Sequence, residues 1–366
     1  MARKLKSDKL LFLAIVVLVA LSAVMVYSAS TGTAIDQTGP SYQLMFRQLT
    51  WAVIGFFLLA ITMRLDYRTW QSPAVIWTAV ILVTAALVVV LFGREINGTR
   101  RWFAVGGIGI QPSEFAKLAA ILFTSDLLAR RMERVNDVAG TLVPIGLMTG
   151  LFMSLILLEP DFGTAITLLV IVSMMLFAAG LDYRYLFGVG LAALPALYMA
   201  LVSADYRRRR LFAFLDPWDD PLDSDFQLIQ SLISVGTGGF TGRGFMEGVQ
   251  KLSYVPFPHT DFIYAVIGEE LGLVGATGVL LCFSVIVWRG LRIAMSAQDH
   301  FGAFLAAGLT ALVAAQALVN MSVVLGLLPT KGIPLPFVSA GGSSLVVNLI
   351  GMGILLNVSQ HASPDG

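Results

Sequence analysis

Long apolar runs separated by short polar breaks are the dominant pattern along this chain of 366 residues. An α-helix needs roughly 20 mostly apolar residues to cross a bilayer, and ten runs reach or approach that length. The pattern predicts an all-α polytopic membrane protein, with one transmembrane domain over residues 1–366 and a large outer loop at 204–260. The expected spans are approximately 10–29, 48–63, 73–92, 112–129, 140–158, 162–180, 185–203, 262–287, 302–327 and 341–357.

Composition agrees with this class, since 57% of the residues are hydrophobic and only 13% are charged, with a mean hydropathy of +0.81. A soluble domain carries roughly 25% charged residues, so little of this chain can fold in water. The formal net charge of +1 gives no electrostatic reason to expect nucleic acid as a partner. The single cysteine, Cys282, lies in an apolar run, and the three histidines are too scattered to suggest a zinc or haem site.

Lysine and arginine positions orient the spans. The basic N-terminal segment precedes an apolar run, Leu10 to Val26, which exceeds the roughly 7–15 residues of a secretory signal core. We therefore expect an uncleaved first span. Positive charge in short loops marks the cytoplasmic side, and with ten spans both termini fall on that side. The alternate loops on that side carry Arg64 and Arg68; Arg130, Arg131 and Arg134; Arg184; and Arg289 and Arg292.

The outer side also carries arginines, against the usual rule. Arg94, Arg100 and Arg101 crowd the short outer loop 93–111, and Arg207–Arg210 follow the seventh span. One interpretation is an anionic ligand on the outer face. The other is a solvated loop that tolerates arginine.

Charged residues also occur inside the fourth expected span. Pro112 suits the first position of a helix, and Glu114 and Lys117 follow three residues apart on one face. Both would lie below the outer surface, where charge is costly and usually functional. The alternative is a local ion pair that only neutralises itself.

Two further outer segments carry candidate chemistry. Glu159-Pro160-Asp161 lies in a short turn between two apolar runs, which indicates helix capping first and a cation or sugar-hydroxyl contact second. Residues 227–233 have the pattern of a short amphipathic helix, which we expect to lie along the outer membrane surface. The glycine-rich segment 236–244 indicates a flexible loop or an anion-binding nest.

Asp261 lies where a polar, proline-rich segment enters the eighth span. It suits the N-cap of that helix, or a chemical role at the membrane surface. The last outer loop, 328–344, contains three prolines and several glycines, which predicts irregular backbone. Such backbone at membrane depth must line a cavity or be buried in protein. A carboxylate beside an anion site at a lipid-accessible surface is what transfer from a lipid-phosphate donor requires.

Several of these segments together resemble one known family. The stretches PHTDFIYAVIGEELGLVG, QPSEFAKL, EPDFGT, DPW…FQLIQSLISVGTGG and LLPTKGIPLPFVSAGGSS are similar, in this order, to segments of the SEDS family (shape, elongation, division and sporulation proteins). The resemblance runs from about residue 10 to residue 358. VQKLSYVPFPHTDF and LPTKG are more similar to the cell-division (FtsW-like) branch than to the elongation (RodA-like) branch. Ala340 departs from the family, because a tyrosine is expected there.

The resemblance implies a peptidoglycan glycosyltransferase that polymerises lipid II into glycan strands outside the cytoplasmic membrane. The family's essential acid falls on Asp261, which would act as general base while undecaprenyl diphosphate leaves with inversion. Cations would stabilise the leaving diphosphate, first Lys117 and Arg101, then Arg94 and Arg210. The residues expected to bind substrate are Lys117, Glu114, Arg101, Arg94, Arg210, Trp102, Glu159, Asp161, Thr164, Gln227, Gln230, Lys251, His259, Thr260, Lys331, Ser343 and Ser344.

The family also implies partners. These are a class B penicillin-binding protein that supplies the transpeptidase, other membrane proteins of division or elongation, and the nascent glycan strand. No organic cofactor is expected, and the sequence leaves open whether a divalent cation, Mg²⁺ or Mn²⁺, assists. The alternatives are a lipid II flippase, an elongation polymerase and a scaffold that only recruits division proteins. A scaffold leaves the outer carboxylates and cations unexplained, and we find no internal repeat of the kind common in transporters.

Overall fold

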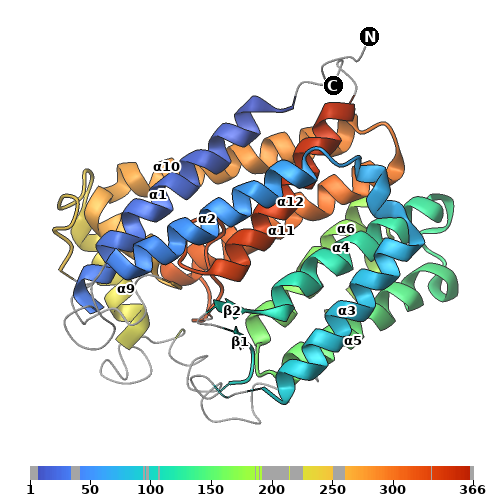
Figure 1. The fold of residues 1–366 in the computed structure, drawn as a ribbon, viewed down its shortest axis with the longest axis horizontal. Coiled ribbons are helices and arrows are strands. Elements are labelled where there is room, and N and C mark those ends of the chain that lie inside the picture. Colours follow the sequence, from blue (N-terminus) through green and yellow to red (C-terminus); the bar gives the residue numbers. More distant parts are fainter. Residues whose placement is uncertain are drawn as a thin grey trace.

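The computed structural model describes residues 7–33, 42–93, 95, 99–105, 108–185, 187–188, 190–191, 214, 226–249, 260–330 and 332–362. Helices make up most of this part of the chain and run side by side as a bundle (Figure 1). Its elements, in order, are α1 (Lys9–Thr33), α2 (Tyr42–Thr62), η1 (Tyr67–Gln71), α3 (Pro73–Leu91), β1 (Phe103–Val105), β2 (Ile108–Ile110), α4 (Pro112–Arg130), η2 (Met132–Arg134), η3 (Val138–Leu142), α5 (Val143–Leu158), α6 (Phe162–Ala178), α9 (Phe226–Gly238), α10 (Ile263–Ser296), α11 (His300–Val324) and α12 (Gly342–His361).

The predicted class, a polytopic all-α membrane protein, is confirmed. Within the described ranges, seven helical segments are long and apolar enough to cross a membrane. α6 is a shorter apolar helix, and α4 carries the charged residues noted in the sequence. The seven segments are α1, α2, α3, η3 with α5, α10, α11 and α12.

Several boundaries differ from the sequence expectation. α2 begins at Tyr42 rather than at residue 48, α10 continues to Ser296, and α12 ends at His361 rather than at residue 357. The polar residues at these ends belong to the helices although they lie outside the apolar runs. The antiparallel hairpin of β1 and β2 was not predicted. The expected span at 185–203 lies mostly outside the described residues.

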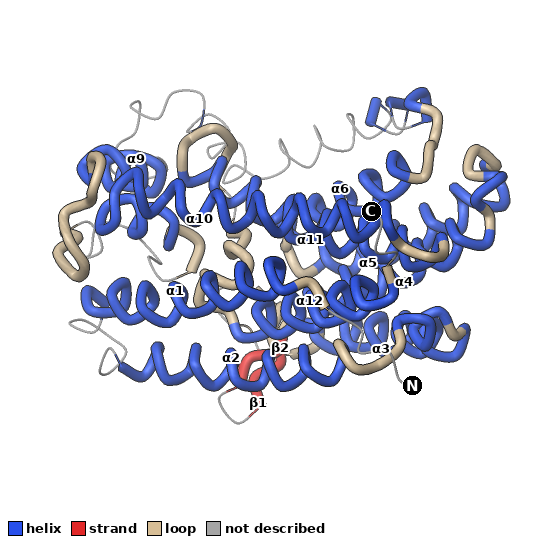
Figure 2. Tube along the Cα trace, turned by 90° about the horizontal axis from the view of Figure 1, so that it is seen from above, coloured by secondary structure: helices blue, strands red, loops and turns tan. Residues whose placement is uncertain are grey.

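α11 and α12 form the centre of the bundle. Across an apolar stretch of 18 residues, 78% of α11 and 83% of α12 is buried, whereas only 22% of the corresponding stretch of α2 and of α3 is buried. α12 packs on α2, and α11 packs on α10, α4 and α6. Figure 2 shows α10 and α11 in one layer, α1 and α12 beneath them, and α2 on the far side. The two central helices therefore fix where the outer helices stand.

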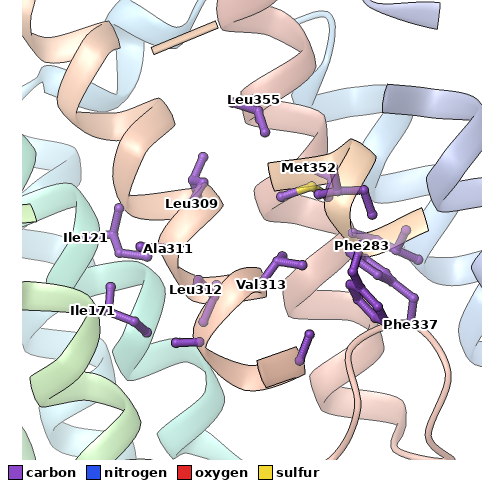
Figure 3. Packing of buried hydrophobic residues seen from close by; sticks show 14 of the residues in the cluster. Ile121, Ile171, Phe283, Leu309, Ala311, Leu312, Val313, Phe337, Met352 and Leu355 are labelled. Atoms are coloured by element: carbon purple, nitrogen blue, oxygen red, sulfur yellow. The ribbon is translucent and has the colours of Figure 1, made fainter. Parts of the chain in front are cut away.

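Buried apolar side chains fill the contacts around α11 (Figure 3). Leu309 and Leu312 lie near Ile121 of α4 and Ile171 of α6, while Met352 of α12 lies on the other side. Glycine brings α12 close to α2, since a Cβ on Gly353 would lie 2.6 Å from the backbone oxygen of Leu59. In a bilayer, such close packing stabilises helix pairs that gain nothing from hiding apolar surface from lipid.

Polar contacts hold the helix ends on the predicted cytoplasmic side. The backbone N–H of Asp8, just before α1, donates to Ser359 Oγ near the end of α12 (3.2 Å), and its carboxylate pairs with Arg289 of α10 (2.6 Å). The start of the first helix and the end of the last helix therefore lie on the same side of the bundle, as predicted. Nearby, the Tyr67 hydroxyl donates to the Asp299 carboxylate, and the Tyr67 N–H donates to Asn357 Oδ1 (2.8 Å).

Candidate active site

Asp261 is a half-buried residue in the turn that leads into α10, two residues before the helix begins. The N-cap of α10 is Phe262, which has no capping side chain. Of the two interpretations of Asp261, the N-cap is therefore wrong by one residue. Its carboxylate faces the last outer loop, since a Cβ on Gly332 would lie 2.9 Å from Asp261 Oδ2. Asn320 of α11 donates from Nδ2 to the backbone oxygens of both Asp261 and Ile333 (2.8 Å each), which fixes the two segments side by side.

The segment 332–341 is irregular backbone, as predicted. Protein side chains form hydrogen bonds with its backbone N–H and C=O groups. Ser339 Oγ donates to the Thr260 oxygen (2.6 Å) and accepts from Leu335 N–H (2.8 Å). Gln48 of α2 donates to the Ser339 oxygen (3.3 Å), and Ser22 of α1 donates to the Val338 oxygen (2.7 Å). Because water cannot satisfy backbone in a membrane interior, these side chains keep the loop at this depth.

The turn between α5 and α6 carries two carboxylates with different environments. Asp161 caps α6, as predicted: Oδ1 accepts from Thr164 N–H (3.1 Å), and Oδ2 accepts from Thr164 Oγ1 (2.9 Å). Glu159 is fully buried, and neither of its carboxylate oxygens has a hydrogen-bond partner among the described residues. Burial raises the pKa of Glu159 to about 8, the charge of Asp161 adds to the rise, and Arg101 opposes it. Glu159 is therefore mostly protonated at neutral pH.

The hairpin segment is tied to this turn and to α12. Arg101 donates from Nε to the backbone oxygen of Glu159 (2.8 Å) and from its terminal nitrogen to the oxygen of Pro160. Gln111 donates from Nε2 to Asp161 Oδ2 (3.1 Å) and from its backbone N–H to Ser343 Oγ (3.1 Å). Trp102 is half-buried beside Gly109, whose backbone oxygen accepts from Ser343 Oγ (3.0 Å).

Glu114 and Lys117 form an ion pair one turn below this level. Lys117 Nζ lies 2.8 Å from Glu114 Oε1, and the two side chains are only 1% and 3% exposed. The ion pair is therefore confirmed, and it lies in the interior. The other Glu114 oxygen and the Ser113 hydroxyl have no hydrogen-bond partner in the described part of the chain. On α12, Ser344 accepts from Asn348 Nδ2 through its backbone oxygen (2.8 Å).

The last outer loop joins these groups to Asp261. Gly332 lies beside the Asp261 carboxylate, while Ile333 Cγ1 would lie 3.0 Å from a Cβ on Gly163, at the start of α6. Two successive loop residues thus bridge the start of α10 and the carboxylate turn. The predicted site residues linked through these contacts are Arg101, Trp102, Glu159, Asp161, Thr164, Thr260, Asp261 and Ser343. Glu114 and Lys117 contact each other, and Ser344 contacts Asn348.

The predicted amphipathic helix exists, but its environment was predicted wrongly. α9 buries Leu228 and Ile229, packs on α10 and α11, and donates from Ser231 Oγ to the Val324 oxygen (2.8 Å). Its apolar face therefore contacts protein rather than the membrane surface. Gln227 and Gln230 are half-buried on this helix. Five other predicted substrate-binding residues lie outside the described residues: Arg94, Arg210, Lys251, His259 and Lys331.

Sequence reasoning missed four residues that organise the site: Asn320, Gln48, Glu269 and Glu270. Glu269 and Glu270 are both 0% exposed within α10. Two adjacent acids inside an expected span are a signal that could have found them, because buried charge in a membrane is usually functional. Over the described ranges, no group of three or more His, Cys, Asp or Glu side chains is arranged to hold a metal ion.

The fold and the site together define a class: a multi-span helical membrane protein with carboxylates and cations gathered at one level. Comparison with known proteins then gives the family. The model of the FtsW, RodA and SpoVE proteins, described as a cell cycle protein family, matches residues 8–364, and the chain belongs to that family.

Relatives and solved structures agree over nearly the full length. A probable peptidoglycan glycosyltransferase FtsW of Geobacter sulfurreducens is 43% identical over 358 residues, which cover 97% of this chain and 95% of that protein. The stage V sporulation protein E of Bacillus subtilis is 40% identical over 366 residues, covering 98% and 99%.

Among solved structures, a chain of a peptidoglycan synthase complex matches with a TM-score of 0.80 and 33% identity, over 99% of this chain and 100% of that one. The rod-shape-determining protein RodA of Thermus thermophilus matches with a TM-score of 0.73 and 28% identity, over 99% of each chain. The predicted family resemblance is therefore confirmed.

Proposed function

We propose that this protein is a peptidoglycan glycosyltransferase that polymerises lipid II at the outer face of the cytoplasmic membrane during cell division. The observation that carries the proposal is the position of Asp261, held beside Gly332 by Asn320 and joined through Ile333 to the turn containing Glu159 and Asp161. The names of the relatives support the same reaction class.

In the proposed reaction, Asp261 acts as general base. Its carboxylate takes the proton from the 4-hydroxyl of the acceptor GlcNAc while that oxygen attacks C1 of the donor MurNAc. The bond from C1 to the diphosphate oxygen breaks, and undecaprenyl diphosphate leaves with inversion at C1. A positioned general base typically contributes roughly 10²–10⁴-fold to the rate.

Two cations of the described residues would stabilise the leaving diphosphate. Arg101 lies at the turn and Lys117 lies one helical turn below it, with Glu114 orienting the Lys117 ammonium at 2.8 Å. Arg94 and Arg210 are further candidates from the sequence. The neutral Glu159 would donate a hydrogen bond to a sugar or phosphate oxygen, a role that an ionised carboxylate cannot perform.

We propose a class B penicillin-binding protein as partner, which would supply the transpeptidase. Similarity to a chain of a peptidoglycan synthase complex supports this pairing. A divalent cation, Mg²⁺ or Mn²⁺, would assist by neutralising the diphosphate, and its addition to metal-free enzyme tests that role.

The experiment is polymerisation of purified lipid II by the protein co-purified with its class B partner. Asp261→Asn should fold and bind the partner but lose at least about 100-fold in rate, since the general base is removed. Asp126→Asn is the matched control, because it removes a carboxylate paired with Arg130 at the other end of α4. Full activity of Asp261→Asn would exclude the general-base role, and lipid translocation without polymer would favour a lipid II flippase.

A further inference from the structure

α10 is interrupted in its outer part. Gly272 has φ 64° and ψ −161°, a conformation outside the helical region. In a continuous helix, the carbonyls of Glu269 and Glu270 would accept from the N–H groups four residues later. Here they accept from another segment: the Glu269 oxygen from Arg243 N–H (3.0 Å) and the Glu270 oxygen from Gly244 N–H (3.1 Å).

The same segment also accepts hydrogen bonds from N–H groups that follow the interruption. Leu273 N–H donates to the Gly239 oxygen (3.0 Å), and Val274 N–H donates to the Phe240 oxygen (3.2 Å). Residues 239–249, here called the insertion loop, therefore complete the hydrogen bonding of both halves of α10. The approach requires glycine, because a Cβ on Gly272 would lie 2.7 Å from the Phe240 oxygen.

Two buried carboxylates hold the rest of the insertion loop. Glu270 accepts from Met246 N–H through Oε2 (3.1 Å) and from Ser28 Oγ of α1 through Oε1 (2.7 Å). Glu269 accepts from Val249 N–H through Oε1 (2.8 Å). Both acids are 0% exposed, so their contacts lie away from solvent, where hydrogen bonds to charged groups are strong.

The two carboxylates enclose the loop backbone between them. A Cβ on Gly248 would lie 3.0 Å from Glu270 Oε1 and 3.1 Å from Glu269 Oε2. Nearer the start of the loop, Arg243 Nη1 lies 3.7 Å from Glu269 Oε1. The two neighbouring acids therefore contact the loop at Arg243, Met246 and Val249.

The half of α10 before the interruption begins at Ile263, two residues after Asp261. Residues 262–270 are all buried, unlike the lipid-facing second half of the helix. Its direction is fixed at one end by Asn320 and at the other by the insertion loop. A shift of the loop would therefore move the segment that carries Asp261.

We propose that Glu269 and Glu270 are positioning residues for Asp261: they clamp the insertion loop to the interruption in α10 and so set the orientation of the Asp261 segment. This inference rests on the proposed function, in which Asp261 is the general base. A misplacement of about 1 Å can cost about 100-fold in rate.

The test compares Glu269→Ala and Glu270→Ala with the glutamine variants Glu269→Gln and Glu270→Gln, in the protein co-purified with its partner. Glu247→Ala is the matched control, because Glu247 is an exposed acid on the same loop. kcat and KM for lipid II are measured together with hydrogen exchange at the Met246 and Val249 amides.

A disulfide tests the clamp independently. Phe240→Cys and Val274→Cys are introduced in a Cys282→Ser background, at two positions whose backbones are hydrogen-bonded. If an alanine variant does not fold, it is produced with the engineered disulfide already formed. The disulfide is then reduced, and kcat, KM and hydrogen exchange are measured from that point.

We expect each alanine variant to lose about 10–100-fold in kcat with KM within threefold, to exchange both amides faster, and to recover kcat when the disulfide closes. The glutamine variants should stay close to wild type, because an amide oxygen still accepts from Met246 or Val249. Wild-type kcat in an alanine variant with a released loop would overturn the proposal. A kcat that stays low in an alanine variant after its disulfide has formed would also overturn the proposal. A low kcat in a glutamine variant whose Met246 and Val249 amides exchange as slowly as in the wild type would overturn it too. Failure of the proposed function would instead appear as no polymer from the wild type.

Discussion

Removing the Lys117 ammonium is the sharpest test of the buried ion pair. Lys117 Nζ lies 2.8 Å from Glu114 Oε1, and both side chains are almost completely buried. Lys117→Met keeps the length of the side chain but leaves the Glu114 carboxylate without its cation. The double variant Lys117→Met/Glu114→Gln removes both charges and preserves the shape of each side chain.

The expected magnitudes follow from the geometry. At 2.8 Å, the Coulomb attraction is about 6 kcal/mol at an effective dielectric constant of about 20. Burying two ions costs several kcal/mol each, so the intact pair contributes little net stability. Removing one partner leaves an unpaired buried charge, which costs roughly 3–5 kcal/mol. We therefore expect Lys117→Met to lower the free energy of unfolding by that amount, and the double variant to recover most of it.

The assay measures unfolding in SDS titrations and polymerisation of lipid II for the wild type and both variants. The double variant should approach wild-type stability and still polymerise poorly, because the Lys117 contact with the diphosphate is lost. Wild-type polymerisation by the double variant would show that the pair only neutralises itself. A double variant no more stable than Lys117→Met would refute the energetic reasoning about the buried pair.

Three further outcomes are expected. The pKa of Glu159 is raised to about 8 by burial and by the charge of Asp161, so the folded state holds a proton that the unfolded state releases near pH 4.5. The proton on Glu159 contributes fully to stability below pH 4.5, and this contribution is lost as the pH rises through about 8. Glu159→Gln should therefore flatten the dependence of stability on pH over this range, measured by chemical denaturation. Tyr67→Phe removes the hydroxyl that donates to Asp299 and should cost roughly 1–3 kcal/mol in SDS titrations, with kcat unchanged. Gly238→Ala should loosen α9 and lower polymerisation, since its Cβ would lie 2.8 Å from the Gly268 carbonyl carbon, and faster hydrogen exchange in α9 would check the cause.

Interactions close in sequence were predictable. The Glu114–Lys117 pair follows from a spacing of three residues on one helix face, and the Asp161 cap follows from an acid placed just before an apolar run. The irregular backbone near 332–341 follows from its prolines and glycines. In each case the deciding interaction involves residues a few positions apart, so the local pattern contains it.

Interactions distant in sequence were not predictable in the same way. The apolar face of α9 fits a membrane surface and a protein surface equally well, and only its contacts with α10 and α11 decide between them. The sequence of the insertion loop indicates only a flexible glycine-rich stretch, because Glu269 and Glu270 lie 20 and 24 residues from the loop amides that they accept from. Burial of Glu159 likewise depends on the packing of segments that the sequence does not place together.

The two irregular segments explain how a carboxylate can be held in a fixed position where a membrane helix begins. A helix end is usually the most mobile part of a span, since its first N–H groups have no partner within the helix. Here Asn320 ties the start of the Asp261 segment to loop 332–341, and Glu269 and Glu270 tie its far end to the insertion loop. Moving Asp261 therefore requires breaking buried hydrogen bonds, each costing about 1–3 kcal/mol when a partner is left unsatisfied. A general base needs such fixed geometry, whereas a helix cap alone does not.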